Sequence, residues 1–542
     1  MEKETLYLRK ASGLVRAFSV FDGFAYAVFA VAIVEATALS YALAWPWPDA
    51  NIPLGIIINC LGFLPVFIVY AALTSIMPRS GGEYIWLSRT FGGIWGMVFT
   101  FLVGMLGPMF FIASNAFPGI VMVVSPSLIV TGKVIGNDGL VGAGTWLTTL
   151  DGLFFFTIVY CIFALIIVAL GMKWYAILQK ISFWVGTIGI ITWIVLLAQT
   201  SRETFISNFN WFMSTTFGWG GDNPYQYMLT EAASAGYKTV PFAQTTFMPS
   251  VLIGPVLAYA FAAAFWSGNL TGEIRAVNDF KRALYVFVGA DIFSMVACAA
   301  LIYLVIQMVG NEFFTAANFI WMTGRAASMP VAPFYGLFII TATRNPIWWF
   351  WILIGFHAWF WMWPTNNYVG STRYMFAMSF DRMLPSFLSS VKTRFATPFY
   401  ALIVFFIGAV IFAYLYYYTP FASYTLGMPL FMVILFLGVC SAGIVFPYSK
   451  RTREMYEASP MGKYRVGNIH LITITGVLGF LYSLYMVILY ITDANYGVNQ
   501  FWSLVFVAGG MVIAAIIYIG LKMYRKSRGV EVDKLYGTIP VE

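Results

Sequence analysis

Charged side chains are scarce in this sequence. Only 10% of its 542 residues are Asp, Glu, Lys or Arg, whereas 61% are hydrophobic. Soluble domains carry about 25% charged residues, so the composition excludes an ordinary soluble protein. Charge-free runs such as 395–449 exceed the roughly 20 residues that a membrane-spanning helix needs. The sequence therefore predicts an integral membrane protein.

Cysteine and histidine are also rare, with four and two residues. The four cysteines fall within apolar runs, and we interpret them as small buried residues without a disulfide framework or metal-ligand spacing. The sequence has no zinc-protease motif, no phosphate-binding loop and no pair of catalytic carboxylates in one span. We therefore expect no metal, no cofactor and no enzymatic activity.

The apolar runs predict an all-α protein with about twelve transmembrane helices. We place these helices at residues 17–44, 53–77, 93–124, 152–170, 179–198, 250–272, 284–309, 347–370, 400–417, 425–446, 471–491 and 501–521.

The basic residues predict the orientation. Of the 30 Lys and Arg residues, 25 fall in the segments that are cytoplasmic if the N-terminus is inside. Such a bias is typical of cytoplasmic loops, so we expect a multi-pass plasma-membrane protein with both termini in the cytoplasm. The net charge of +8 then reflects topology, and we expect the partners to be a bilayer and a small molecule, not a nucleic acid. The sequence does not indicate the oligomeric state.

The spans can be grouped into two five-helix halves of opposite orientation, residues 1–198 and 250–446. An extracellular loop, 199–249, joins them, and two additional spans within 447–522 and a cytoplasmic tail, 523–542, follow. Spans 1 and 6 are each rich in alanine. Small residues suit either close helix packing or the broken first helices of an inverted-repeat transporter.

Four motifs, all on the predicted cytoplasmic side, resemble the amino acid–polyamine–organocation (APC) permeases in order and spacing. They are Leu14 to Asp22 before the first span, Pro78 to Tyr84 after the second, Gly272 to Arg275 at the end of the sixth, and Ser371 to Pro385 after the eighth, followed by Ala396-Thr397-Pro398. The resemblance covers about residues 9–450. It implies a leucine-transporter-like 5+5 inverted repeat with two extra helices, alternating access, and an amino acid or related amine as substrate.

In this family the substrate lies at breaks in spans 1 and 6, where helix N-termini attract its carboxylate. The resemblance therefore implies a site formed by Ala30, Ile33, Val34 and Glu35 from span 1 and by Ala262, Ala263, Phe265, Trp266 and Asn269 from span 6. Family members often have Gly-Ser-Gly at the first break. This chain has Ile33-Val34-Glu35 instead, and that glutamate would favour a cationic substrate unless it is protonated.

Ionisable groups inside a membrane are costly and usually functional. Glu35, Asp291 and His357 are the candidates for proton coupling, because each falls within a predicted span. Glu35 could instead bind an amine, and all three could be structural groups that neighbouring helices satisfy. The middle of span 8 lacks the Ser or Thr with which sodium-coupled relatives bind the ion, which favours proton coupling or uncoupled exchange.

Six charged residues near the cytoplasmic surface, Arg79, Glu83, Glu273, Arg275, Arg373 and Asp381, could form ion pairs that close an inner gate. They could equally be separate solvated charges, because exposed pairs contribute only about 0–1 kcal/mol each.

We therefore predict a secondary active transporter for an amino acid or small amine, working by symport or antiport. A cationic amine or polyamine permease and a nutrient-sensing receptor on a transporter fold are the alternatives. The receptor would need an interaction domain, for which the tails are short.

Overall fold

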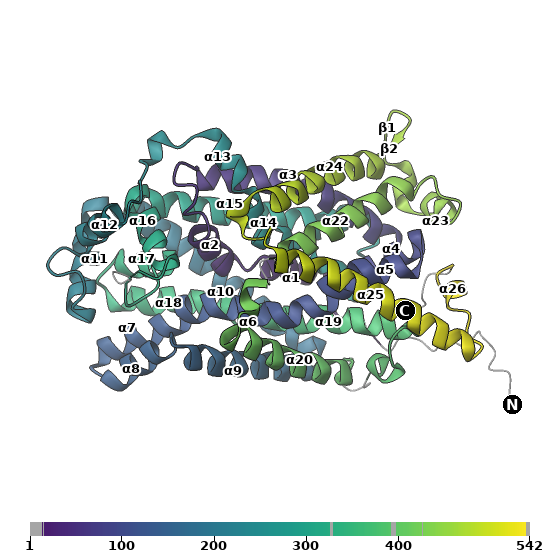
Figure 1. Ribbon diagram of the computed structural model, residues 1–542, viewed down its shortest axis with the longest axis horizontal. Coiled ribbons are helices and arrows are strands. Elements are labelled where there is room, and N and C mark those ends of the chain that lie inside the picture. The colour runs from purple at the N-terminus through teal and green to yellow at the C-terminus, as the bar shows by residue number, and fades with distance from the viewer. Residues whose placement is uncertain (1–13, 15, 326–328, 392–396, 425–426, 538–542) are drawn as a thin grey trace.

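A computed structural model describes residues 14, 16–325, 329–391, 397–424 and 427–537. Val15 and Ala396 of the motifs above, and the last five residues of the predicted tail, lie outside these ranges. The described chain is almost entirely helical, and the helices form one elongated bundle (Figure 1).

The first half of the chain contains α1 (Val20–Val31), α2 (Ile33–Ala42), α3 (Ile52–Ile76), α4 (Gly82–Phe91), α5 (Gly93–Thr100), η1 (Phe101–Leu106), α6 (Gly107–Gly119), η2 (Ile120–Val124), α7 (Ser125–Ile135), α8 (Asp138–Trp146), α9 (Leu150–Ala169) and α10 (Met172–Gln199). The middle contains α11 (Arg202–Phe217), α12 (Pro224–Ser234), η3 (Phe242–Gln244), α13 (Phe247–Leu252), α14 (Gly254–Phe261), η4 (Ala262–Glu273), α15 (Phe280–Val309), α16 (Asn311–Met322), α17 (Tyr335–Thr341), α18 (Pro346–Phe360) and α19 (Met362–Phe380). The last part contains η5 (Ser386–Ser389), α20 (Phe399–Tyr418), α21 (Phe421–Tyr424), α22 (Met428–Val445), α23 (Arg453–Glu457), η7 (Pro460–Lys463), the antiparallel strands β1 (Arg465–Val466) and β2 (Ile469–His470), α24 (Leu471–Thr492), η8 (Ala494–Tyr496), α25 (Phe501–Ser527) and α26 (Val532–Leu535).

Eleven helical segments among the described residues are long and apolar enough to cross a membrane. The all-α membrane fold is thus confirmed, but the count of twelve is not. The predicted eighth span, 347–370, is occupied by two consecutive helices, α18 and α19, which meet at Trp361. The third span is longer than predicted, because α5 to α7 run on from Gly93 to Ile135 through the π-helical segments η1 and η2.

Polar residues start several of these helices. Asn51 caps α3, Thr149 caps α9 and Ser201 caps α11, each by accepting a hydrogen bond from a backbone N–H in the first turn. Ser19 and Asp22 form a reciprocal capping box at the start of α1. Such side chains satisfy donors that a helix start leaves without a partner, and they explain why these helices begin where they do.

Two interruptions lie in the middle of the bundle. Between α1 and α2, Ala32 takes a left-handed conformation with φ 54° and ψ 68°, which costs a non-glycine residue roughly 1–2 kcal/mol. The α-helix α14 changes at Ala262 into η4, a 3₁₀ helix of 12 residues. Runs of 3₁₀ helix this long are uncommon and often mark a hinge. Because α1 packs against η4, the two interruptions lie side by side.

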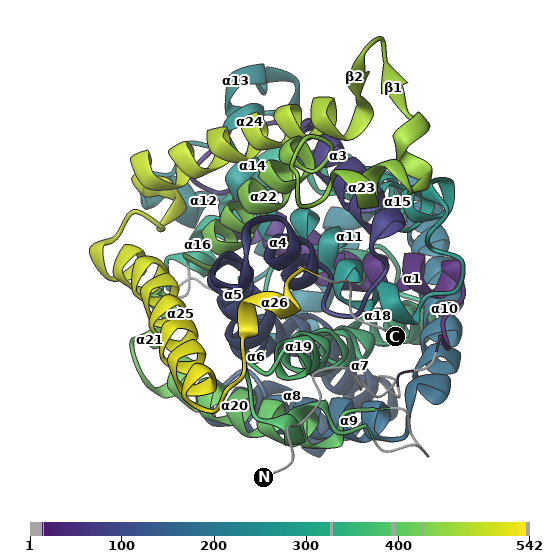
Figure 2. The same cartoon turned by 90° about the vertical axis from the view of Figure 1, so that its right-hand side faces the viewer.

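The bundle has two distinct ends (Figure 1). We name the end with α4, α23 and α26 the inner end, since its loops carry most of the basic residues, and the end with α8, α11, α12 and α17 the outer end. The segment 199–249, predicted as a loop, contains the helices α11 and α12. Figure 2 views the inner end, where α26 crosses in front of α5.

Candidate functional site

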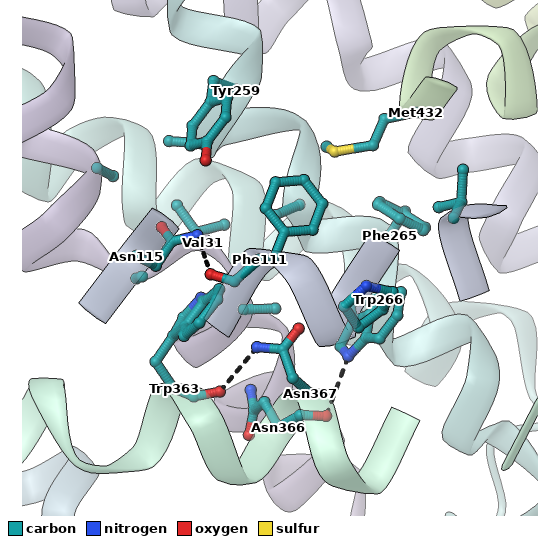
Figure 3. Close-up of a pocket in the computed structure, with 17 residues that line it drawn as sticks. Val31, Phe111, Asn115, Tyr259, Phe265, Trp266, Trp363, Asn366, Asn367 and Met432 are labelled. Carbon is teal, nitrogen blue, oxygen red and sulfur yellow. Dashed lines mark hydrogen bonds between the residues drawn. The ribbon is translucent and has the colours of Figure 1, made fainter. Parts of the chain in front are cut away.

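A cavity lies in the middle of the bundle, beside both helix interruptions (Figure 3). Its volume of about 60 Å³ holds only a few water molecules. The lining residues are Ala30, Val31, Ala32, Ala36, Val103, Pro108, Phe111, Asn115, Tyr259, Ala260, Ala263, Phe265, Trp266, Trp363, Asn366, Asn367 and Met432. None of them is charged, and most are apolar or aromatic.

Two amide side chains offer acceptors to this cavity. Asn115 donates to the carbonyl of Phe111 (3.0 Å), and Asn367 donates to the carbonyl of Trp363 (3.1 Å). The amide oxygens of Asn115 and Asn367 make no hydrogen bond within the described part of the chain. The oxygen of Asn367 points up into the cavity in Figure 3. Each oxygen can therefore accept a hydrogen bond from a ligand.

The helix break offers donors. Because α2 starts at Ile33, its first N–H groups have no partner within α2. Ala32 and Ala36 line the cavity on either side of this first turn. The N-terminus of a helix attracts anions through these donors and through its dipole. One edge of the cavity is thus suited to a carboxylate, and the two amide oxygens are suited to an ammonium group.

On the outer side, the cavity adjoins a larger hollow. Tyr259 lines both the cavity and this hollow, whose volume is about 330 Å³. Its hydroxyl is 3.0 Å from the Ser114 hydroxyl, and its ring meets Phe111 edge to face with 5.7 Å between centroids. The outer closure is therefore thin.

On the inner side, backbone and side-chain bonds join several segments directly below the cavity. The Tyr26 hydroxyl donates to the carbonyl of Asn366 (3.0 Å), and the Ser267 hydroxyl donates to the carbonyl of Gly23 (2.9 Å). The N–H of Gly81 donates to the carbonyl of Asn269 at 2.8 Å. These bonds connect α1, η4, α19 and the loop before α4 on the inner side of the cavity, and together they form an inner closure.

Two buried ion pairs strengthen this inner closure. Arg373 on α19 binds Glu273 at the end of η4 through two hydrogen bonds of 2.7 and 3.0 Å. Arg89 on α4 binds Asp381, just after α19, through bonds of 2.5 and 2.9 Å. None of the four side chains is more than 1% exposed. Such bidentate pairs are strong and geometrically specific, so α4, α19 and η4 are held together as a unit.

Glu83 lies at the contact between α4 and η4. Its carboxylate accepts a hydrogen bond from the Tyr374 hydroxyl, and a side chain at Gly268 would come within 2.8 Å of it. Burial raises the pKa of the Glu83 carboxyl to about 7, although the bond from Tyr374 works in the opposite direction. Glu83 can therefore gain or lose a proton near neutral pH within the inner closure.

The other buried carboxyl groups lie outside the cavity. Glu35 and Asp291 are each 1% exposed, and among the described residues no donor lies in hydrogen-bonding geometry to either carboxylate. Tyr160 lies near Glu35, and the Cys60 thiol lies beside Asp291. A buried charge without a partner is very unfavourable, so both groups are expected to carry a proton in this conformation.

His357 is hydrogen-bonded on both sides of its ring. The Trp361 indole donates to Nδ1 at 3.1 Å, and Nε2 is 3.0 Å from the Ser127 hydroxyl. Since Ser127 donates its own proton to the carbonyl of Val123, Nε2 must be the donor to Ser127. The network thus holds a neutral ring with its proton on Nε2, which favours the structural interpretation of His357.

Comparison with protein-family models matches residues 18–521 to the amino acid permeases. The chain belongs to the amino acid permease family. This places the permease in the APC superfamily and confirms the resemblance that the four motifs indicated. The family is one of membrane transporters for small molecules. No curated protein matched the chain.

Four of the nine residues predicted to bind substrate line the cavity of this permease: Ala30, Ala263, Phe265 and Trp266. The other five, Ile33, Val34, Glu35, Ala262 and Asn269, are not among the lining side chains. Asn269 is hydrogen-bonded instead to Tyr26 and to the carbonyl of Trp266. The backbone of Ile33 to Glu35 still forms the first turn of α2.

The six predicted gate residues divide into two groups. The structure brings Glu83, Glu273, Arg373 and Asp381 together in the inner closure. Arg79 instead bonds to the carbonyl of Pro78, and Arg275 bonds to the carbonyl of Arg16 at the exposed surface.

Sequence reasoning missed several residues of the permease site. Neither Arg89, which binds Asp381, nor Trp363, which lines the cavity, is among the predicted site residues. Asn366 and Asn367 have no predicted role, although two neighbouring amides near the end of a predicted span are an unusual polar signal. Arg89 and Asp381 are 292 positions apart, and no local pattern could have paired them.

Proposed function

We propose that this permease carries a neutral amino acid with an apolar side chain across the plasma membrane by alternating access. The observation that carries the proposal is the uncharged cavity beside the α1–α2 break, with backbone donors at one edge and the amide side chains of Asn115 and Asn367 in its lining. A zwitterion needs both kinds of group, whereas its side chain needs only the apolar wall.

The binding mode follows from these positions. The substrate carboxylate would bind the first N–H groups of α2, and its ammonium would donate to the oxygens of Asn115 and Asn367. The side chain would then lie against Val103, Phe265 and Met432, which line the remaining wall. Because the cavity is small, a bulky side chain would require Tyr259 or Trp266 to move.

A cationic amine or polyamine is a weaker candidate. That alternative depended on Glu35 as the amine ligand, but Glu35 does not line the cavity. An amine without a carboxylate would also leave the start of α2 without a ligand. A receptor on the same fold could use the same cavity, and only movement of substrate separates the two functions.

Uptake into proteoliposomes tests the proposal. Purified permease should accumulate labelled alanine or leucine, and excess unlabelled neutral amino acid should compete. Uptake of putrescine or lysine without uptake of neutral amino acids would favour the cationic alternative. Binding of a neutral amino acid, seen as thermal stabilisation, without any uptake would favour the receptor.

We further propose that Glu35 carries the coupled proton. It adjoins the cavity residue Ala36 in the sequence, so the opening of α2 could expose its carboxyl group to water. Glu35→Gln is expected to abolish uptake driven by a pH gradient while it leaves exchange of internal for external substrate largely intact.

Asp291→Asn is the matched variant, because Asp291 is equally buried but lies further from the break. If Asp291→Asn alone abolishes the pH-driven component, the proton role belongs to Asp291. If neither variant changes it, the permease is not coupled through these groups.

A further inference from the structure

A groove runs along the inner end of the permease, away from the substrate cavity. One wall is the turn between α4 and α5, with Gly92, Gly93 and Ile94, and the other is the end of α25, from Tyr518 to Lys526. Arg451 and Asp533 complete it, and its volume is about 620 Å³. Figure 2 shows α25, α5 and α26 around this region.

The groove carries an excess of positive charge. Three cations line it, Arg451, Lys522 and Lys526, against one carboxylate, Asp533. Lys522 pairs with Asp533 at 2.7 Å, and both side chains are substantially exposed. Arg451 and Lys526 form no ion pair within the described ranges. The three cations come from two different parts of the chain and face one concave space, unlike charges scattered over a solvated surface.

The same groove has an apolar wall that continues onto the outside of the bundle. Ile519 and Met523 line the groove and are 48% and 68% exposed. They belong to α25, which is long and apolar enough to cross the membrane. The groove thus combines unpaired cations with an exposed apolar helix face, at the level where a membrane-spanning helix ends. These features match a ligand with an anionic head and hydrocarbon chains.

We propose that this groove binds the headgroup of an anionic phospholipid. The lipid phosphate lies between Arg451, Lys522 and Lys526, and the acyl chains follow Ile519 and Met523 along α25. Basic pockets at the ends of transmembrane helices recognise such headgroups, and each cation near the membrane surface contributes about 1 kcal/mol, or roughly fivefold in affinity.

The position of Asp533 connects this groove to the inner closure. Its pairing with Lys522 occupies one of the three cations, so a lipid phosphate competes with Asp533. Three residues further on, Tyr536 is only 1% exposed. Its ring lies under the Arg89 guanidinium, 5.5 Å from the centroid, and fills the space beside Gly93. Displacement of Asp533 would therefore loosen a segment that packs on the Arg89–Asp381 pair.

Lipid binding can be measured without any transport assay. Purified permease in neutral detergent is titrated with short-chain phosphatidylglycerol, and thermal stabilisation is recorded; phosphatidylcholine of the same chain length is the control. We expect phosphatidylglycerol to stabilise the protein at lower concentration. The triple variant Arg451→Ala/Lys522→Ala/Lys526→Ala should bind it roughly 100-fold more weakly.

The matched control is Lys281→Ala/Arg282→Ala/Arg465→Ala, which removes the same charge from exposed positions outside the groove. It should bind phosphatidylglycerol like the wild type. Equal losses in the two triple variants, or no loss in either, would overturn the proposal. Stabilisation by glycerol 3-phosphate as strong as that by phosphatidylglycerol would also overturn it, because the groove would then be a site for free phosphate. The single variant Lys526→Ala, at an exposed and unpaired position, should bind phosphatidylglycerol about fivefold more weakly. It keeps the proposal testable if the triple variant does not fold.

Discussion

The Arg373–Glu273 pair should behave as an energetic unit in the inner closure. Both side chains are buried, and two hydrogen bonds of 2.7 and 3.0 Å join them. Removal of one partner leaves the other as a buried charge without compensation, which costs about 3–5 kcal/mol. We therefore expect Glu273→Gln and Arg373→Met each to lower the free energy of unfolding by about that amount.

In the double variant Glu273→Gln/Arg373→Met, the free energy of unfolding should fall by far less than the sum of the two single losses, because no unpaired charge is left. The coupling energy should reach about 3 kcal/mol, at the upper end for residues in direct contact. Unfolding by sodium dodecyl sulfate in mixed micelles, followed by circular dichroism, gives the four free energies of this cycle.

The exposed pair Arg453–Glu457 provides the control. Its geometry is similar, with 2.8 Å between Nε and Oε1, but its side chains are 64% and 54% exposed. Exposed pairs of this i, i+4 kind contribute about 0.3–0.5 kcal/mol. If the cycle at Arg373 and Glu273 is additive to within 0.5 kcal/mol, as expected at Arg453 and Glu457, the buried pair does not hold the inner closure together.

Three further predictions concern other parts of the site. Burial raises the pKa of Glu83 from 4.5 to about 7. Between these pH values the folded state keeps a proton that the unfolded chain releases, so the free energy of unfolding falls as the pH rises from about 4.5 to 7. Glu83→Gln should remove up to about 1.4 kcal/mol per pH unit of this slope; an unchanged slope in a pH series of unfolding would contradict the assignment. Trp266→Ala should weaken substrate binding at least about tenfold, a loss of 1.4 kcal/mol, whereas Trp348→Ala, at a position 41% exposed, should not, as measured by ligand-induced thermal stabilisation. Tyr259→Phe and Ser114→Ala each remove the same hydroxyl–hydroxyl bond, which contributes about 0.5–1.5 kcal/mol. Each should therefore speed substrate dissociation toward the outer side roughly 2- to 12-fold. Stopped-flow rates equal to that of the wild type would show that this bond does not close the site.

The general architecture could be predicted from sequence because it depends on long, repeated patterns. Apolar runs and the distribution of Lys and Arg predict spans over dozens of residues, and eleven helices of the structure bear out the membrane fold. The predicted eighth span is helical but is not among these eleven, and the reason is local. The segment from Met362 to Phe380 is rich in polar residues such as Asn366 and Asn367, and the helix is interrupted at Trp361.

The details of the site depend on interactions that a single sequence does not show. The first helix breaks at Ala32, close to the predicted Ile33–Glu35, but alanine gives no local signal for a left-handed conformation. That Glu35 does not line the cavity follows from its place on α2 only once the break is known. The burial of Tyr536 requires a turn after α25, where the sequence predicts only a cytoplasmic tail.

The unequal thickness of the two closures has a kinetic consequence. One bond between Tyr259 and Ser114 and a ring contact separate the cavity from the outer hollow, whereas two bidentate ion pairs and several backbone bonds must separate or move together to open the inner side. The barrier to outward opening should therefore be the lower one. In a transport cycle this makes opening toward the inner side the slow step, so that turnover, and not external affinity, responds most strongly to changes in α4, α19 and η4.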